Sequence, residues 1–488
     1  MSKAKGVSNV QNSKATLNKE MLRELSVRVR ETYLSDGKPW VVGFSGGKDS
    51  TATLQFVWYA LKALPPERLT KPVYIISSDT LVETPFMTGY LTDVLDNINT
   101  AAKAQNLPIE AHKVHPALED TFWVNMIGRG YPAPSSMFRW CTDRLKIRPA
   151  SRFIQDKIAK YGEVVIVLGA RREESASRAQ AIDRAKNRAG GYGLTRHTKL
   201  TGGWILTPIE DWTTRDVWDY LLQAPNPWGS DNKDLVTMYK NAEGECPLVV
   251  EKNTQPCGNS RFGCWTCTLV EKDKSMEAMF DGGHEWLEPL LNLRDWLYMT
   301  RDPKNKHKYR DHRRRTGRIQ FMESDGNKKI VWGPYKMEIR AQILRDVLLA
   351  QKSIQENSPY NDARLITDEE LHKIRQLWRF EEGDWEDSLP EIYRKITGEE
   401  LDWLDEDWSG MGGMEKEVLS QVCENHNLPT KMLTALLEAE RKQHGMSRRA
   451  GIYTEIGRIL EKDWQTLEEV MADGAYIPEI SEEPCHAD

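Results

Sequence analysis

The chain has 488 residues, of which 39% are apolar and 29% are charged, and its net charge is -6 at pH 7. This length suits about two to four domains, and the composition is that of a folded, soluble chain. The acidic balance excludes bulk attraction to nucleic acid, so such contacts need a local basic patch. The apolar runs have only strand length and the first residues lack a secretory signal, so we expect a cytoplasmic protein without a membrane anchor.

In chain order, the sequence predicts a flexible arm over residues 1–18 and then alternating helices and strands over residues 19–228. Such alternation predicts an α/β fold with a doubly wound parallel sheet, in which ligands bind at the carboxyl ends of the strands. The predicted helices are 18–35, Thr51–Leu64, a helix ending near residue 105, Ala150–Tyr161 and Thr213–Leu222. The predicted strands are Trp40–Phe44, Val73–Ser77, Val164–Leu168 and Ile205–Ile209.

The second half of the chain lacks this alternation. Residues 229–330 are predicted to hold a cysteine cluster, with loops through residue 268, and then a basic segment. Residues 331–474 are rich in Glu, Leu, Lys and Arg and predict a helical C-terminal region with a hinge at Gly410–Gly413. Residues 475–488 predict an acidic tail.

A glycine loop follows the first predicted strand, in the sequence Ser45-Gly46-Gly47-Lys48-Asp49-Ser50. Glycines let backbone amides approach an anion closely, and a helix that begins there favours phosphate. The spacing is not that of a Walker A loop. The alternative is a tight structural turn. The loop resembles the pyrophosphate loop of the N-type ATP pyrophosphatases, which implies ATP binding and pyrophosphate release.

An arginine-rich motif, Gly169–Arg178, follows the strand that ends near Leu168. Arginines at a strand end can clamp phosphate or sulfate in a bidentate manner, although a solvated, charged helix start is the alternative. The motif resembles the signature of phosphoadenylylsulfate reductases, as do Asp79-Thr80 and Pro208–Thr213. The expected nucleotide-binding residues are Ser45, Gly46, Gly47, Lys48, Asp49, Ser50, Asp79, Gly169 and Arg171.

Seven cysteines are present, and four of them lie within residues 246–267. Thiolates in this number suit either a structural Zn site or an iron–sulfur cluster. The pattern resembles that of the cluster-bearing adenylylsulfate reductases, which implies a 4Fe-4S cluster. The implied ligands are Cys141, Cys257, Cys264 and Cys267, with Cys246 as an alternative ligand or persulfide carrier. Cys423 is expected in the core of the helical region.

A basic segment, Arg301–Arg318, contains many lysines and arginines but only two aspartates. Such a concentration in an acidic protein suits contact with a polyanion. The alternative is a solvated face paired with the acidic stretch Asp402–Asp407.

Longer stretches resemble the DNA phosphorothioation sulfurtransferase family (DndC-type), within the adenine nucleotide alpha hydrolase-like superfamily. They include Val41–Thr51, Thr121–Asn125, Gly128–Pro134, Gly244–Leu248 and Cys257–Cys264. The resemblance implies an ATP-dependent sulfurtransferase that adenylylates a DNA phosphate and replaces a non-bridging oxygen by sulfur. It also implies Mg²⁺, which Asp49 would help to hold, a cysteine desulfurase as sulfur donor, and other subunits of a DNA phosphorothioation complex.

The residues expected to act in catalysis are Lys48, Asp49, Arg171 and Arg178. Three other functions remain open. The first is a phosphoadenylylsulfate or adenylylsulfate reductase, although the tail Glu483–His486 lacks the Glu-Cys-Gly-x-His pattern of that enzyme's catalytic cysteine. The second is a tRNA thiolase, and the third is an iron–sulfur scaffold without enzymatic activity.

Overall fold

The computed structural model describes residues 17–186, 191–243, 263–324, 327–402, 412–443, 449 and 451–476. Most of the predicted arm, most of the predicted tail, and Cys246, Cys257 and Cys485 lie outside these ranges. None of the described helices is both long and apolar enough to span a membrane.

The first half of the chain folds around a six-stranded sheet in the order β3-β2-β1-β4-β6-β5. All neighbouring strands are parallel except β5, which pairs antiparallel at one edge. Val42 at the centre of β1 lies opposite Ile75 and Val167, and all three are fully buried. The predicted α/β fold with a mainly parallel sheet is therefore confirmed. The strands are β1 (Trp40–Gly43), β2 (Val73–Ser78), β3 (Ile109–Val114), β4 (Val164–Val167), β5 (Thr195–Arg196) and β6 (Gly203–Leu206).

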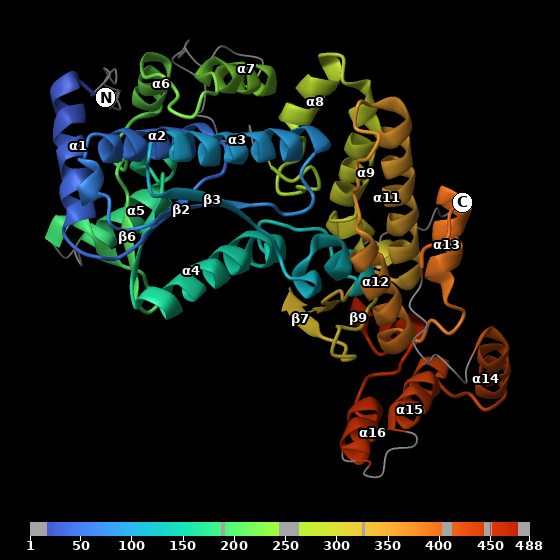
Figure 1. The fold of residues 1–488 in the computed structure, drawn as a ribbon. Coiled ribbons are helices and arrows are strands. Elements are labelled where there is room, and N and C mark those ends of the chain that lie inside the picture. The colour runs from blue at the N-terminus through green and yellow to red at the C-terminus, as the bar shows by residue number, and fades with distance from the viewer. Residues whose placement is uncertain are drawn as a thin grey trace, which may run out of the picture.

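Helices cover both faces of this sheet, with α2 and α3 on one side and α4 on the other (Figure 1). Helix α2 is buried along most of its length because it lies between the sheet and α1 and α6. The helices of this half are α1 (Lys19–Leu34), α2 (Lys48–Lys62), α3 (Pro85–Ala104), α4 (Arg148–Tyr161), α5 (Ala176–Lys186), α6 (Thr214–Gln223) and α7 (Asn232–Glu243).

Several elements of this half differ from the sequence prediction, and α7 and β3 are the clearest. The stretch after Gly229 was expected to form loops through residue 268, and this is wrong for α7. That helix forms because Leu235, Val236 and Tyr239 share one buried face. Strand β3 was not predicted, because its apolar residues alternate with Glu110, His112 and Lys113 in a short edge strand.

The second half is helical, and its hydrophobic core is shared with the connection between β3 and α4. Trp123 of that connection donates from Nε1 to the Leu365 carbonyl at 2.6 Å. Trp378 donates to the Ile127 carbonyl at 2.9 Å. The connection therefore packs into the helical half, beside α8 (Lys274–Asp281), α9 (Glu288–Met299), α10 (Lys306–Tyr309), α11 (Met337–Asn357), α12 (Asp368–Glu381) and α13 (Ser388–Thr397).

The last helices form a smaller unit at the lower right of Figure 1. Its last strand, β9 (Ala475–Tyr476), pairs with β8 (Asn327–Ile330), which pairs with β7 (Phe321–Ser324). Trp385, just before α13, donates to the Glu438 carboxylate at 2.9 Å. Both contacts tie the unit to the helical half. Its helices are α14 (Gly413–Asn425), α15 (Thr430–Gln443), α16 (Ile452–Leu460) and α17 (Leu467–Ala472).

Candidate active site

The glycine loop joins the carboxyl end of β1 to the first turn of α2. Gly46 has φ of +73°, and a Cβ there would lie 2.7 Å from Leu91 Cδ2, so both backbone and space require glycine. The N-cap residue, Gly47, has no side chain that could cap the helix. The free amides and the dipole of α2 are therefore available to an anion at this end.

Hydroxyl groups and a lysine complete the loop. The Ser45 and Ser50 hydroxyls lie 3.1 Å apart, and Ser50 donates to the Gly47 carbonyl at 2.9 Å. The Lys48 ammonium lies 5.3 Å from the centre of the Tyr239 ring, whose hydroxyl accepts from the Lys48 amide at 3.3 Å. Tyr239 thus fixes the start of α2 from outside the motif.

A hydrogen bond links Arg171 to Asp49, two predicted site residues that are 122 positions apart in sequence. Its Nε donates to Asp49 Oδ1 at 2.6 Å, and the Asp49 Oδ2 atom lies 3.3 Å from Lys48 Nζ. Arg171 is only 2% exposed and is held by the Trp212 carbonyl and by Glu173. Its guanidinium therefore positions the Asp49 carboxylate at the loop.

Gly169 explains why β4 can approach α2 so closely. A Cβ at this position would lie 2.7 Å from Thr53 Oγ1 and 2.8 Å from the Asp49 carbonyl oxygen. Any side chain would therefore push α2 away from the strand. The glycine acts through packing at the place where the sequence predicts nucleotide binding.

The other arginines of the motif point to different partners. Arg172 pairs with Asp183 and Asp211 at 2.5 and 2.8 Å. Arg178 is half exposed and contacts Glu174 rather than the glycine loop. Arg171 is thus the member of the motif that the structure brings to the loop, and a catalytic role for Arg178 stays a prediction.

Asp79 follows β2 at the same edge of the sheet. Its Oδ1 atom accepts from the Leu81 amide at 3.0 Å, and Lys113 and His115 each lie 3.7 Å from Oδ2. The carboxylate therefore shapes the turn after β2. Its role in nucleotide binding stays a prediction.

The cysteine turn packs against this same end of β2. Cys264 forms an isolated β-bridge with Glu83, and its Sγ atom lies 3.2 Å from Thr80 Oγ1. Cys267 donates its amide to the Cys264 carbonyl at 3.1 Å. The cysteines therefore reach the carboxyl edge of the sheet, where the glycine loop also lies.

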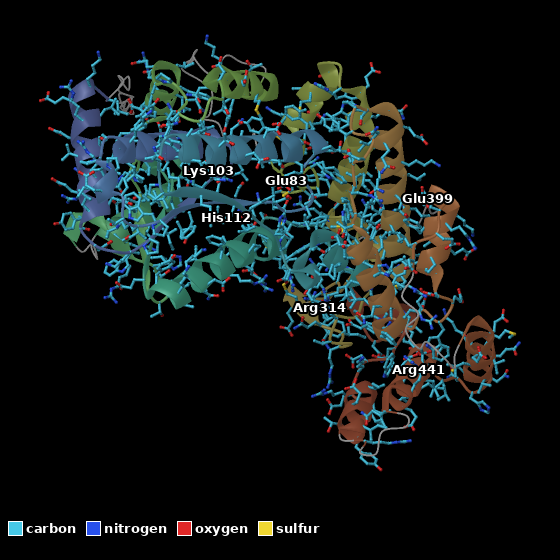
Figure 2. All side chains as sticks on the ribbon, in the orientation of Figure 1. Glu83, Lys103, His112, Arg314, Glu399 and Arg441 are labelled. Carbon is cyan, nitrogen blue, oxygen red and sulfur yellow. The ribbon has the colours of Figure 1, made fainter. Side chains whose placement is uncertain are left out.

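Lys146 connects the two cysteine segments. The negative charge of the Cys264 thiolate, followed by those of Glu83, Cys267 and Cys141, raises the pKa of the Lys146 ammonium. Burial raises the pKa of Cys264 to about 12 and that of Glu83 to about 7. Figure 2 places Glu83 where the sheet half meets the helical half. The site is a set of partly buried thiols near one lysine.

The donor set suits a soft metal or an iron–sulfur cluster in chemical type. Cys141, Cys264 and Cys267 supply thiols from two segments, and the other predicted ligands, Cys257 and Cys246, lie outside the described ranges. Within those ranges, no three Cys, His, Asp or Glu side chains are close enough together to form a metal site. Thiolate ligation would offset the burial that raises the pKa of Cys141 and of Cys264.

The arginines of the basic segment make different kinds of contact. Arg310 and Arg314 donate to backbone carbonyls of Trp332 and Gly333, so they hold the chain in place, and burial lowers the pKa of Arg310 to about 10. Arg313 pairs with Asp311. The segment lines a groove of about 1400 Å³ whose other wall includes α15 and α16 and whose surface carries both charge signs. Figure 2 labels Arg314 in the basic segment and Arg441 in α15.

Comparison with known proteins gives two family matches. Residues 39–270 match the phosphoadenosine phosphosulfate reductase domain. Residues 414–461 match a small protein found in certain Dnd DNA modification systems. These matches support the predicted phosphoadenylylsulfate reductase-like superfamily for the sheet half and a link to Dnd systems for the C-terminal unit.

A curated relative and two solved structures also show similarity. An uncharacterized protein of Methanocaldococcus jannaschii is 27% identical over 243 residues, which are 50% of this chain and 39% of the relative. The chain thus spans about two fifths of that relative's length.

The U34-tRNA thiolase NcsA from Methanococcus maripaludis, solved with its 4Fe-4S cluster, is 13% identical, with 58% of this chain and 80% of that chain covered. Candida glabrata FMN adenylyltransferase is 12% identical, with 49% of this chain and 68% of that chain covered. Both TM-scores are 0.26, too low to support a conclusion about this chain.

Several residues at the site were not identified from the sequence. Tyr239 contacts the glycine loop. The sequence signal that could have identified it is its helical spacing from Leu235, which places both side chains on one buried face. Glu83 and Lys146 face the cysteines, yet they belong to no metal-ligand pattern. Thr80, which the sequence singled out together with Asp79, contacts Cys264. The bridge between Glu83 and Cys264 brings the turn after β2 to the cysteines.

Proposed function

We propose that this protein is an ATP-dependent sulfurtransferase that acts on phosphates of the DNA backbone. The observation that carries the proposal is one chain with both a reductase-type domain, residues 39–270, and a segment matching a Dnd-system protein, residues 414–461. The first supplies a loop for nucleotide phosphates and the second indicates a DNA modification system. The buried Trp385–Glu438 hydrogen bond fastens the second unit to the body of the protein.

The proposed chemistry has two steps. A non-bridging oxygen of a DNA phosphodiester attacks the α-phosphorus of ATP, and pyrophosphate leaves. The terminal sulfur of a cysteine persulfide then attacks the activated DNA phosphorus, and AMP leaves. A second thiol cleaves the remaining sulfur–sulfur bond and forms a disulfide with the carrier cysteine. Adenylylation is needed because an oxygen of a phosphodiester is a poor leaving group.

The residues of the glycine loop fit the first step. The open first turn of α2 and the Lys48 ammonium would stabilise the charge of the departing pyrophosphate. The Asp49 carboxylate, oriented by Arg171, would hold Mg²⁺, which neutralises charge on the phosphates when bound. We also expect Ser45 and Ser50 to donate their hydroxyls to phosphate oxygens.

The cysteines have the chemistry that the second step needs, but the described thiols would have to move closer together to bind one cluster. Cys141, Cys264 and Cys267 would hold a 4Fe-4S cluster, with Cys257 or Cys246 as the fourth ligand and the remaining thiol as sulfur carrier. The cluster would fix these segments and supply a site for sulfide when bound. The Lys146 ammonium would stabilise negative sulfur beside Cys264. A cysteine desulfurase and further Dnd-type subunits are the expected partners.

The test is mass spectrometry of nuclease-digested DNA from cells with the wild-type chain, with Lys48→Ala, and without the gene. A sulfur-bearing dinucleotide should appear only with the wild type. Its presence in all three samples, or its absence from all three while companion subunits are expressed, would contradict the proposal.

The match of residues 39–270 also favours a second activity, reduction of phosphoadenylylsulfate. Purified protein supplied with that nucleotide and a thiol reductant would then release sulfite. We expect none. Another alternative, a tRNA thiolase, predicts a thiolated nucleoside in digests of tRNA from the same cells, and this nucleoside would be lost with Lys48→Ala.

A further inference from the structure

An exposed apolar turn lies beside the cysteines. In the turn Ser135–Phe138, Met137 is 96% exposed and Phe138 is 47% exposed. The Met137 value is the highest among the large apolar side chains that the structure describes. Single exposed apolar residues are common, but adjacent ones at the tip of a turn indicate a contact surface when the turn is fixed.

The turn is held on both sides. Ser135 and Phe138 exchange backbone hydrogen bonds of 3.2 and 3.0 Å. On the incoming side, the Ala133 amide donates to the buried Tyr335 hydroxyl at 3.0 Å. On the outgoing side, Trp140 donates to the Pro132 carbonyl at 2.9 Å. The tip is therefore preorganised, which lowers the entropic cost of a contact there.

Its position connects both cysteine segments. Thr268, which directly follows Cys267, donates to the Pro134 carbonyl at 2.7 Å. Phe138 precedes Cys141 by three residues, and Trp140 between them stacks on Phe122 with ring centres 5.2 Å apart. A ligand on the turn would therefore lie next to the thiols.

Arginines and a tyrosine extend the surface. The Tyr131 ring lies 6.2 Å from the Phe138 ring, and the guanidiniums of Arg144 and Arg315 lie 5.2 and 4.9 Å from its centre. In the described ranges, the exposed side chains of Arg315 and Arg139 form no ion pair with a carboxylate. Two guanidiniums thus remain for an anionic ligand.

The nearby acidic groups do not cancel this charge. Asp120 is shared by Arg144 and Arg148 at 2.5 and 2.8 Å, and Asp143 pairs with Arg148 at 2.8 Å. The surface combines an exposed ring, a flexible methionine and unpaired arginines. Proteins that bind unpaired nucleotides use this combination, in which the ring stacks on a base and the cations contact phosphates.

We propose that the Ser135–Phe138 turn stacks an unpaired base of the nucleic-acid substrate on Phe138, with Arg139 and Arg315 contacting the flanking phosphates. This rests on the proposed function and adds that the substrate is presented with a base out of its stack beside the cysteines. A base within a duplex has no free face, so single-stranded or locally opened DNA is the form that fits.

The test uses the full chain, purified anaerobically, and single-stranded and duplex oligonucleotides that carry the fluorescent base 2-aminopurine. Stacking on an aromatic side chain contributes about 1–3 kcal/mol per base, so Phe138→Ala should weaken single-strand binding by roughly 5- to 150-fold. Phe138→Trp should restore binding and quench the probe, whereas Phe138→Leu should not. Without DNA, water can replace the DNA oxygen as the nucleophile, and this basal hydrolysis of ATP to AMP and pyrophosphate should stay at the wild-type rate.

Tyr453→Ala is the matched control, because Tyr453 is an 88% exposed aromatic residue on α16. It should leave oligonucleotide binding unchanged. The proposal would be overturned if Phe138→Leu bound the oligonucleotide as well as the wild type does. It would also be overturned if the variant lost a protein partner in pull-downs while DNA binding stayed intact, because the turn would then be a protein-docking surface. Unchanged binding by Phe138→Ala would also overturn it.

Failure of the proposed function gives a different result. In that case the wild type produces no sulfur-bearing dinucleotide in cells, whatever residue occupies position 138. If Phe138→Ala still weakens binding of an oligonucleotide, the stacking contact holds for another nucleic acid.

Discussion

The sheet half and the helical half assemble their functional residues in different ways. The glycine loop is six consecutive residues, and one long-range contact, Arg171 to Asp49, completes it. The cysteine site instead combines the turn after β2, the segment that contains Cys141, and the turn at Cys264. A contiguous motif carries its own backbone geometry, whereas a dispersed site depends on the packing of the whole core.

The cores show the same difference. In the sheet half, buried apolar strands follow one another along the chain. In the helical half, Trp123 and Trp378 lie far apart in sequence but are linked through backbone carbonyls. Trp123 donates to the Leu365 carbonyl, just before the helix that contains Trp378, and Trp378 donates to the Ile127 carbonyl, close to Trp123. The two sites should therefore respond differently to substitution, and three predictions test this.

The largest expected effect is at the glycine loop. Lys48→Ala and Asp49→Asn should each reduce pyrophosphate release from ATP by at least about 100-fold, since both remove charge that acts on the reacting phosphates. Asn keeps the shape of Asp49 beside the buried Arg171, so the fold should persist. Release is measured by a coupled pyrophosphate assay, with circular dichroism as the check on folding.

Lys62→Ala, an exposed position in the last turn of the same helix, is the control and should leave the rate unchanged. Orthophosphate as the first product of the wild type would contradict the assignment of the loop.

The second effect separates the two sites. Cys264→Ser and Cys267→Ser should each abolish bound iron and acid-labile sulfide in anaerobically purified protein, because a thiolate ligand is lost. The basal hydrolysis of ATP to AMP and pyrophosphate, in which water replaces the DNA oxygen, should remain, since the glycine loop does not contain these thiols. Iron, sulfide and the visible absorption spectrum are the measurements.

Cys423→Ser is the control for this experiment, because Cys423 is fully buried in α14 and is not a predicted ligand. It should retain the iron. A colourless wild-type protein with stoichiometric Zn would show instead that the cysteines form a structural metal site.

The smallest expected effect lies in the helical core. Glu370 caps the start of α12 and is 1% exposed, and burial raises its pKa to about 7. The folded protein thus keeps a proton that the unfolded chain releases near 4.5. Proton binding by Glu370 therefore stabilises the folded state most below pH 4.5, and this stabilisation decreases as the pH rises toward 7. Above that pH the free energy of unfolding no longer changes with the titration of this group.

Glu370→Gln cannot ionise and still fits the capping arrangement. At pH 8 it should be more stable than the wild type by up to about 3 kcal/mol, and the gain should shrink toward pH 5. Urea unfolding at both pH values measures it. Glu369→Gln, whose carboxylate has a lowered pKa, should not show this gain. If Glu370→Gln increased the free energy of unfolding equally at both pH values, titration of Glu370 would be excluded as the cause.

Much of the sheet half could be predicted because its signals are local. Trp40–Gly43 is a short apolar run that ends in glycines, and Val164–Val167 is another, so both strands and the parallel fold follow from composition and order. Strand β3 and helix α7 escaped prediction. Their apolar residues are interrupted by charged ones, and only burial against neighbours shows which face is inside.

By itself, the sequence determined the glycine loop and its preference for an anion, because two glycines and a helix start act within a few residues. It also indicated that cysteines gather in the second half. Only the tertiary structure decided that Arg171 faces Asp49 while Arg178 contacts Glu174 outside, and that Lys146 and Glu83 lie with Cys264. These distances depend on the order of strands in the sheet and on the packing of the β3–α4 connection into the helical core, which no local pattern encodes.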